Sequence, residues 1–540
     1  MLHPPHRDGH SRGNPAQYPI NIINILDIID IVLYHDDRGS FLLSSMQIGR
    51  FEVAIVGGGF SGAVLAVQLL QRTPGLRVAL VDPGPQFGRG LAFSTTKSCH
   101  LLNVPCGSMS AFPEESDHFL EWARANHAWS TGESDFLPRG VYGRYIQSLL
   151  NDARTRCRHE NPAGLQDEVV SLSYDSSGLR LRLRSGAEML AQVAVLATGN
   201  NKSTELNIPG LSENSQRYFA SAWSSNALNG IPQKGSVLFI GSGLTSVDAA
   251  AALRSEGFVG QIHMLSRHGL LPQVHKHSAV WPAFHAETYC QSVRGWLREI
   301  RREVERASAA GVDWRAVIDA LRPFTQKVWQ SLTIEERKRF LRHLRPYWEA
   351  HRHRMAPELG AVIHHLIHHQ QIKVHAGRVK SCVERTECVE VHFKNRGSGR
   401  DEALRVDRVI NCTGPECDFR RIDSPLFRSL FDQGLVRPDG LHLGLDVDRE
   451  GRLLNRSGEP SRSLYAIGPV RKGNLWETTA VPEIRVQAAQ LARLLADILR
   501  DRQTHPESAL RDAGSDQRFS SAGRPLLSVD QRLKWSPHAE

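Results

Sequence analysis

The chain has 540 residues, of which 41% are hydrophobic, and a formal net charge of only +9. At about 150 residues per domain this length predicts three to four domain-sized units, and the composition excludes a chain that is disordered overall. So mild a basic excess does not indicate a nucleic-acid-binding protein. The eight cysteines form no CxxC pair, so we expect neither a disulfide framework nor a zinc ribbon, and a cytoplasmic, reducing compartment.

The first 50 residues differ from the rest. Residues 18–34 form an isoleucine-rich run, but Asp27 and Asp30 lie inside it, and acidic side chains are costly at the middle of a membrane. The apolar region of a secretory signal also excludes such acids. We therefore expect no membrane anchor. We interpret residues 1–50 as a disordered or spurious N-terminal extension, with Met46 as an alternative translation start.

A short apolar strand, a glycine-rich turn and a helix are predicted next. The turn has the spacing G-x-G-x-x-G at Gly57, Gly59 and Gly62, with Ser61 inside it. These glycines allow, in order, a tight turn, close approach of the backbone to a pyrophosphate, and close packing of helix on strand. The free N–H groups at the helix start, together with the helix dipole, attract phosphate. The pattern predicts a dinucleotide-binding loop.

An acidic residue follows where this fingerprint expects one. The next predicted strand, residues 77–81, ends in Asp82, about 20 residues beyond the last glycine of the turn. A carboxylate there can accept hydrogen bonds from the ribose hydroxyls. The strand, turn, helix and acid together are a stronger signal than the glycines alone. We assign residues 51–235 to the first part of an FAD-binding domain.

A second copy of the loop lies at residues 235–253. It carries Gly241 and Gly243, but Ser246 replaces the third glycine. The strand that follows ends without an acid and leads into Arg267. A basic residue at this place favours the 2′-phosphate of NADPH, although a merely solvent-facing arginine is the alternative. We assign residues 236–374 to an NAD(P)-binding domain.

Each loop is followed downstream by a small meander and a strand that ends in Thr-Gly. The first ends at Thr198 and Gly199, and the second ends at Gly414. Further on, a strand ends at Gly468 ahead of a helix predicted at 481–499. In flavin enzymes a glycine at such a place lets the backbone approach the flavin. We therefore assign residues 375–500 to the second part of the FAD domain, and residues 501–540 to a disordered tail.

Residues 286–370 have apolar side chains at helical spacing, which predicts an amphipathic helical insertion that covers the nicotinamide domain. Its basic residues alternate with acidic ones, which is typical of a solvated face. His364, His365, His368 and His369 form i,i+4 pairs, a spacing that metal ligands use. The glutamate of an HExxH motif is missing, so we expect no metal site.

Further motifs point to a family. They lie at residues 88–95, 100–105, 109–113, 138–143 and 266–272. With the two loops, they resemble an FAD/NAD(P)-binding flavoprotein monooxygenase family that includes FAD-dependent urate hydroxylase and L-aspartate N-monooxygenases. The resemblance covers roughly residues 50–500. It implies an α/β fold with two Rossmann-like domains, in which the NAD(P) domain and its helical insertion interrupt the FAD domain.

The resemblance also implies roles for individual residues. FAD would be held by Gly57, Gly59, Ser61, Gly62, Asp82, Thr198, Gly199 and Gly468, with His100, Leu101, Asn103 and Val104 near the flavin. NAD(P)H would be held by Gly241, Gly243, Thr245 and Arg267. No residue is assigned a catalytic role by the sequence, and His100, Asn103 and Arg139 are the candidates for the flavin pocket.

The expected function is that of an FAD-dependent, NAD(P)H-using monooxygenase with a small-molecule substrate and O₂, and with neither nucleic acid nor membrane as a partner. Hydroxylation of urate to 5-hydroxyisourate ranks first, and Arg89, Arg139, His100 and Asn103 are candidates to hold the urate ring. The alternatives are N-hydroxylation of an amino acid such as aspartate, which needs an arginine clamp, and a non-catalytic FAD-binding redox module.

Overall fold

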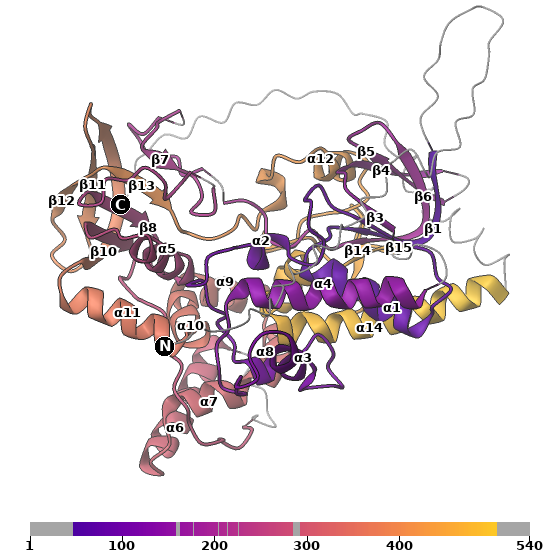
Figure 1. Ribbon diagram of the computed structural model, residues 1–540, viewed down its shortest axis with the longest axis horizontal. Coiled ribbons are helices and arrows are strands. Elements are labelled where there is room, and N and C mark those ends of the chain that lie inside the picture. The colour runs from indigo at the N-terminus through magenta and orange to yellow at the C-terminus, as the bar shows by residue number, and fades with distance from the viewer. Residues whose placement is uncertain are drawn as a thin grey trace, which may run out of the picture.

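The computed structural model describes residues 47–157, 163–175, 178–203, 205–212, 214–224, 226–284 and 292–504. Two sheets, each flanked by helices, lie at opposite ends of the molecule (Figure 1). This arrangement confirms the predicted α/β fold with two Rossmann-like units. The predicted N-terminal extension up to residue 46 and the predicted tail beyond residue 504 lie outside the described residues.

The first sheet has the strand order β14-β15-β6-β1-β2-β3, and β5 joins β6 to β4. Its central strands are parallel, and the part of β1 that leads into the first loop is buried on both faces. That explains the unbroken apolar run in the sequence. The strands are β1 (Gln47–Val56), β2 (Val78–Val81), β3 (Ala163–Leu165), β4 (Val169–Asp175), β5 (Gly178–Leu183), β6 (Glu188–Leu196), β14 (Arg452–Leu454) and β15 (Pro460–Ala466).

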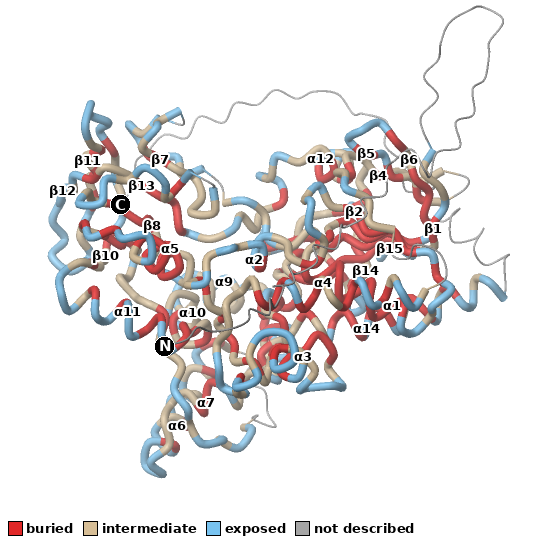
Figure 2. Tube along the Cα trace, in the orientation of Figure 1, coloured by how far each residue is buried: buried red, intermediate tan, exposed pale blue. Residues whose placement is uncertain are grey.

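Helices cover one face of this sheet, and a meander with a short helix covers the other. α1, α4 and α14 run alongside one another, and their facing sides are buried (Figures 1 and 2). Strands β4 and β5 and helix α12 pack on the opposite face. The helices of this unit are α1 (Phe60–Arg72), α2 (Gly90–Phe93), α3 (His118–Asn126), α4 (Arg139–Arg156), α12 (Pro425–Asp432), α13 (Lys472–Leu475) and α14 (Val481–Thr504).

The second sheet has the order β12-β11-β10-β9-β8-β13-β7 and repeats the arrangement of the first, with β8 between two parallel neighbours. Helices α5 (Leu244–Ser255) and α11 (Pro357–His368) pack against it. Its strands are β7 (Tyr218–Phe219), β8 (Ser236–Ile240), β9 (Gln261–Ser266), β10 (Ile372–Glu384), β11 (Val389–Asn395), β12 (Asp401–Val406) and β13 (Arg408–Asn411).

The second sheet extends beyond the boundaries assigned from the sequence. β7 begins at Tyr218, ahead of the boundary at residue 235, because it pairs with β13. β10 to β13 continue to Asn411, beyond the boundary at residue 374, because the antiparallel meander extends β10 and does not return to the first sheet. The first unit therefore resumes after Asn411.

Residues 293–352 form five successive helices below the two sheets. They are α6 (Val293–Ala309), α7 (Trp314–Leu321), α8 (Thr325–Ser331), α9 (Ile334–His343) and α10 (Arg345–Arg352). The sequence predicted that this insertion covers the nicotinamide domain. It does contact that unit, because the backbone N–H of Gln273, after β9, donates to the carbonyl of Ala350 on α10 at 2.8 Å. It also contacts the first unit, where α8 stacks Trp329 on Trp476 with ring centroids 5.1 Å apart. The insertion therefore packs against both units.

The described part of the chain contains neither a membrane-spanning helix nor a cluster of metal-ligating side chains. None of its helices is both long enough and apolar enough to cross a bilayer. None of its groups of three or more His, Cys, Asp or Glu side chains could hold a metal ion. In the histidine-rich helix, the rings of His365 and His369 contact each other at 4.3 Å.

Several buried histidines predict acid sensitivity. Burial lowers the pKa of His100 and His263 to about 4 each, whereas the unfolded chain binds these protons near pH 6.5. The resulting stability is present above pH 6.5 and is lost as the pH falls toward 4, by ~1.4 kcal/mol per pH unit for each proton taken up on unfolding. We expect urea denaturation to give a lower free energy of unfolding at pH 5.0 than at pH 7.5.

A matched variant isolates one of these groups. His263→Asn should flatten the pH dependence by about one proton, because it removes one of these buried titrating groups. The ring of His263 shares a 3.0 Å hydrogen bond with the ring of His375 on the neighbouring strand β10. Equal free energies of unfolding at the two pH values in the unaltered protein would contradict the prediction.

Candidate dinucleotide and substrate sites

The first glycine loop is clamped between β6 and α1. Gly57 has a φ of +111°, and a Cβ there would overlap the carbonyl oxygen of Ala197 at the end of β6. A Cβ on Gly62 would overlap the carbonyl oxygen of Gly57. Gly59 differs, because the nearest atom to a Cβ there is the Cα of Gly90, at 3.4 Å. Gly57 and Gly62 are therefore required for the packing of the turn. The backbone at Gly59 stays accessible to a bound group.

Asp82 stands directly after β2 and accepts hydrogen bonds from the backbone N–H groups of Gly58 and Gly84, each at 2.7 Å. A carboxylate has about four acceptor sites, so it retains capacity for two ribose hydroxyls. The hydrogen bond from Gly58 in the first loop therefore fixes the orientation of the half-buried Asp82 carboxylate. This geometry fits the ribose role implied for Asp82.

Two further segments converge on the same loop. Gly468 has a φ of +75°, and a Cβ there would lie 2.6 Å from Oγ of Ser61. Thr198 follows β6, and its buried Oγ1 has no hydrogen-bond partner among the described residues. An orphaned buried hydroxyl and a backbone approach that only glycine permits are features that a bound group would use. Thr198, Gly468 and Ser61 are therefore compatible with the FAD role expected of them. The roles of Gly199, Leu101 and Val104 stay predictions: Val104 lies in the core of the first unit, and Leu101 packs against the core of the second.

The candidate Arg139 is not free. Its Nη2 lies 2.7 Å from Oδ2 of Asp248 on α5, and the two side chains are only 13% and 3% exposed. Burial raises the pKa of Asp248 to about 6, against the lowering effect of Arg139. The pair joins the two dinucleotide-binding units. Sequence reasoning missed Asp248, although it is the only acidic residue in an otherwise apolar stretch of α5.

The other pocket candidates are also engaged. His100 shares a 2.8 Å hydrogen bond with Thr95 through Nδ1, while its buried Nε2 has no partner among the described residues. Burial, and then the charge of Arg139, lowers the pKa of His100, so the ring is neutral at pH 7. At Asn103 it is the backbone carbonyl, and not the side-chain amide, that accepts from Nε2 of His275 at 3.0 Å. The remaining candidate, Arg89, donates to Gln147 at 2.9 Å.

The second loop opens onto a cleft of about 820 Å³. Gly241 has a φ of +121°, and a Cβ there would lie 2.5 Å from the carbonyl oxygen of Cys412. A Cβ on Gly243 would meet no described atom within 4 Å. Ser246, which replaces the third glycine, is buried and donates to the carbonyl oxygen of Gly241 at 2.8 Å. This hydrogen bond holds the start of α5 to the turn, where a third glycine would have allowed closer packing of the helix. Thr245, the residue before Ser246, lines the cleft.

Arginines surround the end of β9 at this cleft. Arg267 and Arg378 both line it. The pKa of His268, between them, is lowered by burial and then by Arg396, Arg267 and Arg378. The two arginines that line the cleft provide a positive surface suited to a phosphate. The sequence identified only Arg267, because Arg378 lies on β10, more than 100 residues further along the chain.

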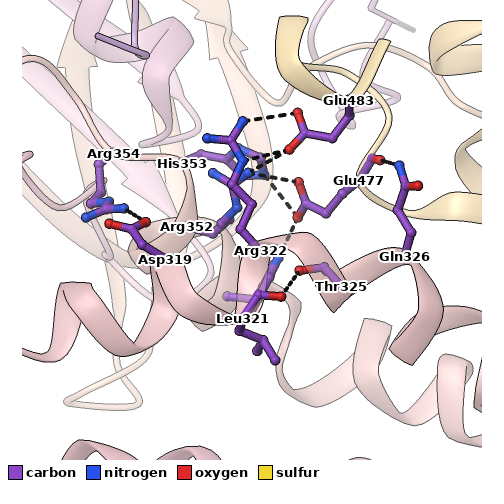
Figure 3. Close-up of polar contacts among 11 residues, drawn as sticks. Asp319, Leu321, Arg322, Thr325, Gln326, Arg352, His353, Arg354, Glu477 and Glu483 are labelled. Carbon is purple, nitrogen blue, oxygen red and sulfur yellow. Dashed lines mark hydrogen bonds and ion pairs between the residues drawn. The ribbon is translucent and has the colours of Figure 1, made fainter. Parts of the chain in front are cut away.

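A buried ionic network ties the helical insertion to the segment after Gly468 (Figure 3). Trp348 Nε1 donates to Oε1 of Glu477 at 2.8 Å, and Arg352 Nη2 lies 3.9 Å from Oε2 of the same carboxylate. Arg352 also lies 3.2 Å from Glu483, which accepts from Arg322 at 2.8 Å. Both carboxylates have arginine partners, and no local pattern in the chain predicted these pairs.

Burial opposes the ionisation of Glu477, but its partners outweigh that effect and hold its pKa below the usual value. The pKa of neighbouring His353 is lowered by burial, so its ring is neutral at pH 7. Arg352 and the indole N–H of Trp348 therefore keep Glu477 ionised at that pH.

Residues 54–201 match the family model described as FAD-NAD(P)-binding. This match covers the first loop, Asp82, β6 and Thr198. No curated protein sequence matches the chain. The first unit is thus similar to FAD-NAD(P)-binding proteins, and the match ends before the second loop.

Solved structures share the fold over most of the chain. L-lysine 6-monooxygenase from Pseudomonas syringae is 15% identical, with a TM-score of 0.58, covering 83% of this chain and 99% of that one. Ornithine hydroxylase from Pseudomonas aeruginosa is 16% identical, with a TM-score of 0.55 and coverage of 83% and 99%. The cadaverine monooxygenase DfoA from Erwinia amylovora is 15% identical, with a TM-score of 0.56 and coverage of 82% and 94%. At these identities the likeness concerns the fold.

Proposed function

We propose that the chain is an FAD-dependent, NAD(P)H-consuming monooxygenase. The observation that carries this proposal is the pair of glycine loops, one at the start of α1 and one at the start of α5, in units joined by the buried Arg139–Asp248 pair. FAD held at the first loop would supply the capacity to take electrons from a nicotinamide and pass them to O₂. The protein's own residues bind and orient the two nucleotides. The similar folds of amine and amino-acid oxygenases support oxygen as the final acceptor.

Anaerobic mixing tests the proposal. The flavin should bleach when NADPH or NADH is added without oxygen, and admission of air should restore the yellow colour. Flavin that stays oxidised with both nucleotides would instead support the non-catalytic redox module.

The polar substrates can then be compared by O₂ uptake. Urate was the first expectation, but Arg139 is paired with the buried Asp248, which leaves Arg89 as the arginine candidate whose contact, through Nε to Gln147, is with a neutral group. The three oxygenases above are named for lysine, ornithine and cadaverine, which favours N-hydroxylation as the second candidate. Coupled O₂ uptake with urate, or with aspartate, ornithine or lysine, separates these possibilities.

We further propose NADPH as the preferred nucleotide, because Arg267 and Arg378 line the cleft of the second loop. Arg267→Ala should raise KM for NADPH about tenfold more than KM for NADH, since one charge-assisted contact to a phosphate contributes about 1.5–3 kcal/mol. Steady-state kinetics with both nucleotides measures this. Arg298→Ala, which removes an exposed arginine of α6 away from the cleft, is the control. An equal rise for both nucleotides would refute recognition of the 2′-phosphate.

A further inference from the structure

The helical insertion forms a second cavity, of about 440 Å³, which is partly open to solvent and shares no lining residue with either glycine loop. Helices α6, α7, α8, α9 and α10 line it, and Trp476 of the first unit forms part of one side. A space of this size matches the pockets of organic ligands, which are about 300–1,000 Å³.

The walls of this cavity are aromatic. Five of the chain's ten tryptophans line it. Trp329 and Trp476 stack at 5.1 Å, and Phe340 meets the ring of Trp476 edge-on at 5.2 Å. The five tryptophans are Trp296, Trp314, Trp329, Trp348 and Trp476. Aromatic walls favour another flat ring through stacked and edge-to-face contacts, beyond the gain from burying apolar surface.

Few polar groups face this space. Thr325 is a lining residue, but its hydroxyl already donates to the carbonyl of Leu321 at 3.2 Å. Arg301, Tyr347 and His351 are the other polar lining residues. The indole N–H groups of Trp296 and Trp476 are buried without a partner among the described residues, so a ligand could offer them one acceptor each. A purine such as urate would bury several donors and acceptors here without partners, and each would cost about 1–3 kcal/mol. The walls select a largely apolar ring.

Helix α10 connects this cavity to the nucleotide cleft. Residues on one face of the helix line the aromatic cavity, and residues on the other face line the nucleotide cleft. Leu344, Tyr347, Trp348 and His351 line the aromatic cavity, whereas Arg345, Pro346, Glu349, Ala350 and His353 line the cleft of the second loop. Opposite faces of helix α10 therefore line the aromatic cavity and the nucleotide cleft, and the helix is a wall that both share.

The segment that contains Trp476 connects the same cavity to the first loop. Trp476 has a φ of +60°, which is strained for a residue with a side chain. The next residue, Glu477, is held by the network in Figure 3. Thr478 donates to the carbonyl of Gly468 at 2.9 Å, and Gly468 lies against Ser61 of the first loop. The cavity wall is thus two residues from a contact with the FAD loop.

We propose that this cavity is the substrate site and that the substrate is a neutral, largely apolar aromatic compound with one or two fused or linked rings. The proposal rests on the proposed oxygenase function and replaces its polar substrates with an aromatic class. It follows from the size of the cavity, the chemistry of its walls and its position between the segments that serve the two nucleotides. Trp476 would contact the ring on the side of the first loop.

Isothermal titration calorimetry on the FAD-loaded full chain tests binding without requiring turnover. 1-Naphthol should bind saturably with a negative heat-capacity change, as burial of apolar surface requires, and decanoate should bind at least tenfold more weakly. Val304→Trp, which adds a ring to a lining position of α6, should weaken 1-naphthol binding at least tenfold. Ser308→Trp, at an exposed position one turn later on the same helix, should leave it unchanged.

A second measurement connects binding to oxidation. NADPH-dependent O₂ uptake should rise at least fivefold with 1-naphthol in the unaltered protein and in Ser308→Trp, but not in Val304→Trp. No saturable 1-naphthol binding, tighter binding of decanoate, or binding that Val304→Trp leaves intact would overturn the proposal. Binding without any effect on O₂ uptake, in a protein whose flavin NADPH does reduce, would also overturn the substrate assignment. Flavin that neither nucleotide reduces would refute the oxygenase function instead. The calorimetric result on 1-naphthol binding would stand in either case, because it does not depend on turnover.

Discussion

Gly243→Val should produce a protein that keeps its flavin but is reduced poorly by NADPH. The backbone at Gly243 is extended, with a φ of −85°, and a side chain there would meet no described atom within 4 Å. The fold should therefore tolerate valine. The added methyl groups would occupy the place where the loop approaches the nucleotide phosphates. We expect KM for NADPH to rise at least tenfold, equivalent to about 1.4 kcal/mol, with unchanged FAD content and Tm.

Two other glycines supply the controls. Gly75→Val places the same side chain at an exposed position with no atom within 4 Å, and it should change neither kinetics nor stability. Gly241→Ala should lower Tm sharply, because Gly241 has a φ of +121° and its Cβ would lie 2.5 Å from a carbonyl oxygen. An unchanged KM in Gly243→Val, measured by anaerobic flavin bleaching over a range of NADPH concentrations, would exclude this loop as the NADPH site.

Glu477→Ala should destabilise the protein by about 3–5 kcal/mol, because it removes one partner of a buried ionic network. The Glu477 side chain is 5% exposed, and that of its partner Arg352 is 6% exposed. After the change, Trp348 Nε1 loses its acceptor, and Arg352 keeps only the contact with Glu483 at 3.2 Å. Urea denaturation monitored by circular dichroism measures the loss.

The matched control is an exposed ion pair. Asp423→Ala breaks a 3.0 Å contact with Arg428, but the Asp423 side chain is 91% exposed, so the change should stay within about 0.5 kcal/mol. Because the pKa of Glu477 is held below its usual value, its contribution is present above about pH 4.3, the value for an unperturbed glutamate, and is lost as the pH falls through the lower folded value. The Glu477→Ala deficit should therefore shrink in acid. A deficit as small as that of Asp423→Ala at pH 7 would contradict the role of this network.

The sequence was most informative where structure depends on neighbouring residues. Gly57, Gly62 and Gly241 could be assigned their roles because a strand, a turn and a helix start within a few residues of one another. The domain boundaries could not be predicted as closely from the sequence. The pairing of β7 with β13 joins residues almost 200 positions apart, and no local pattern encodes such a contact.

The contacts of the site likewise differ between those within a local motif and those between residues far apart in the chain. Arg139 was recognised through a motif, but its partner Asp248 lies more than 100 residues away in the other unit. The amphipathic spacing of Trp296, Trp314 and Trp348 predicted helices with an apolar face. That spacing could not reveal that the faces line a cavity and do not close on each other, because the remaining space depends on how all five helices pack.

Helix α10 has a consequence for the order of events. It forms part of the wall of both the aromatic cavity and the nucleotide cleft, so a shift of this helix caused by one occupant changes the space available to the other. Coupling of this kind is reciprocal: whatever factor the nucleotide adds to affinity in the cavity, the cavity's occupant adds to affinity for the nucleotide. Through such coupling, the consumption of reducing equivalents can be made to depend on the presence of a molecule to oxidise.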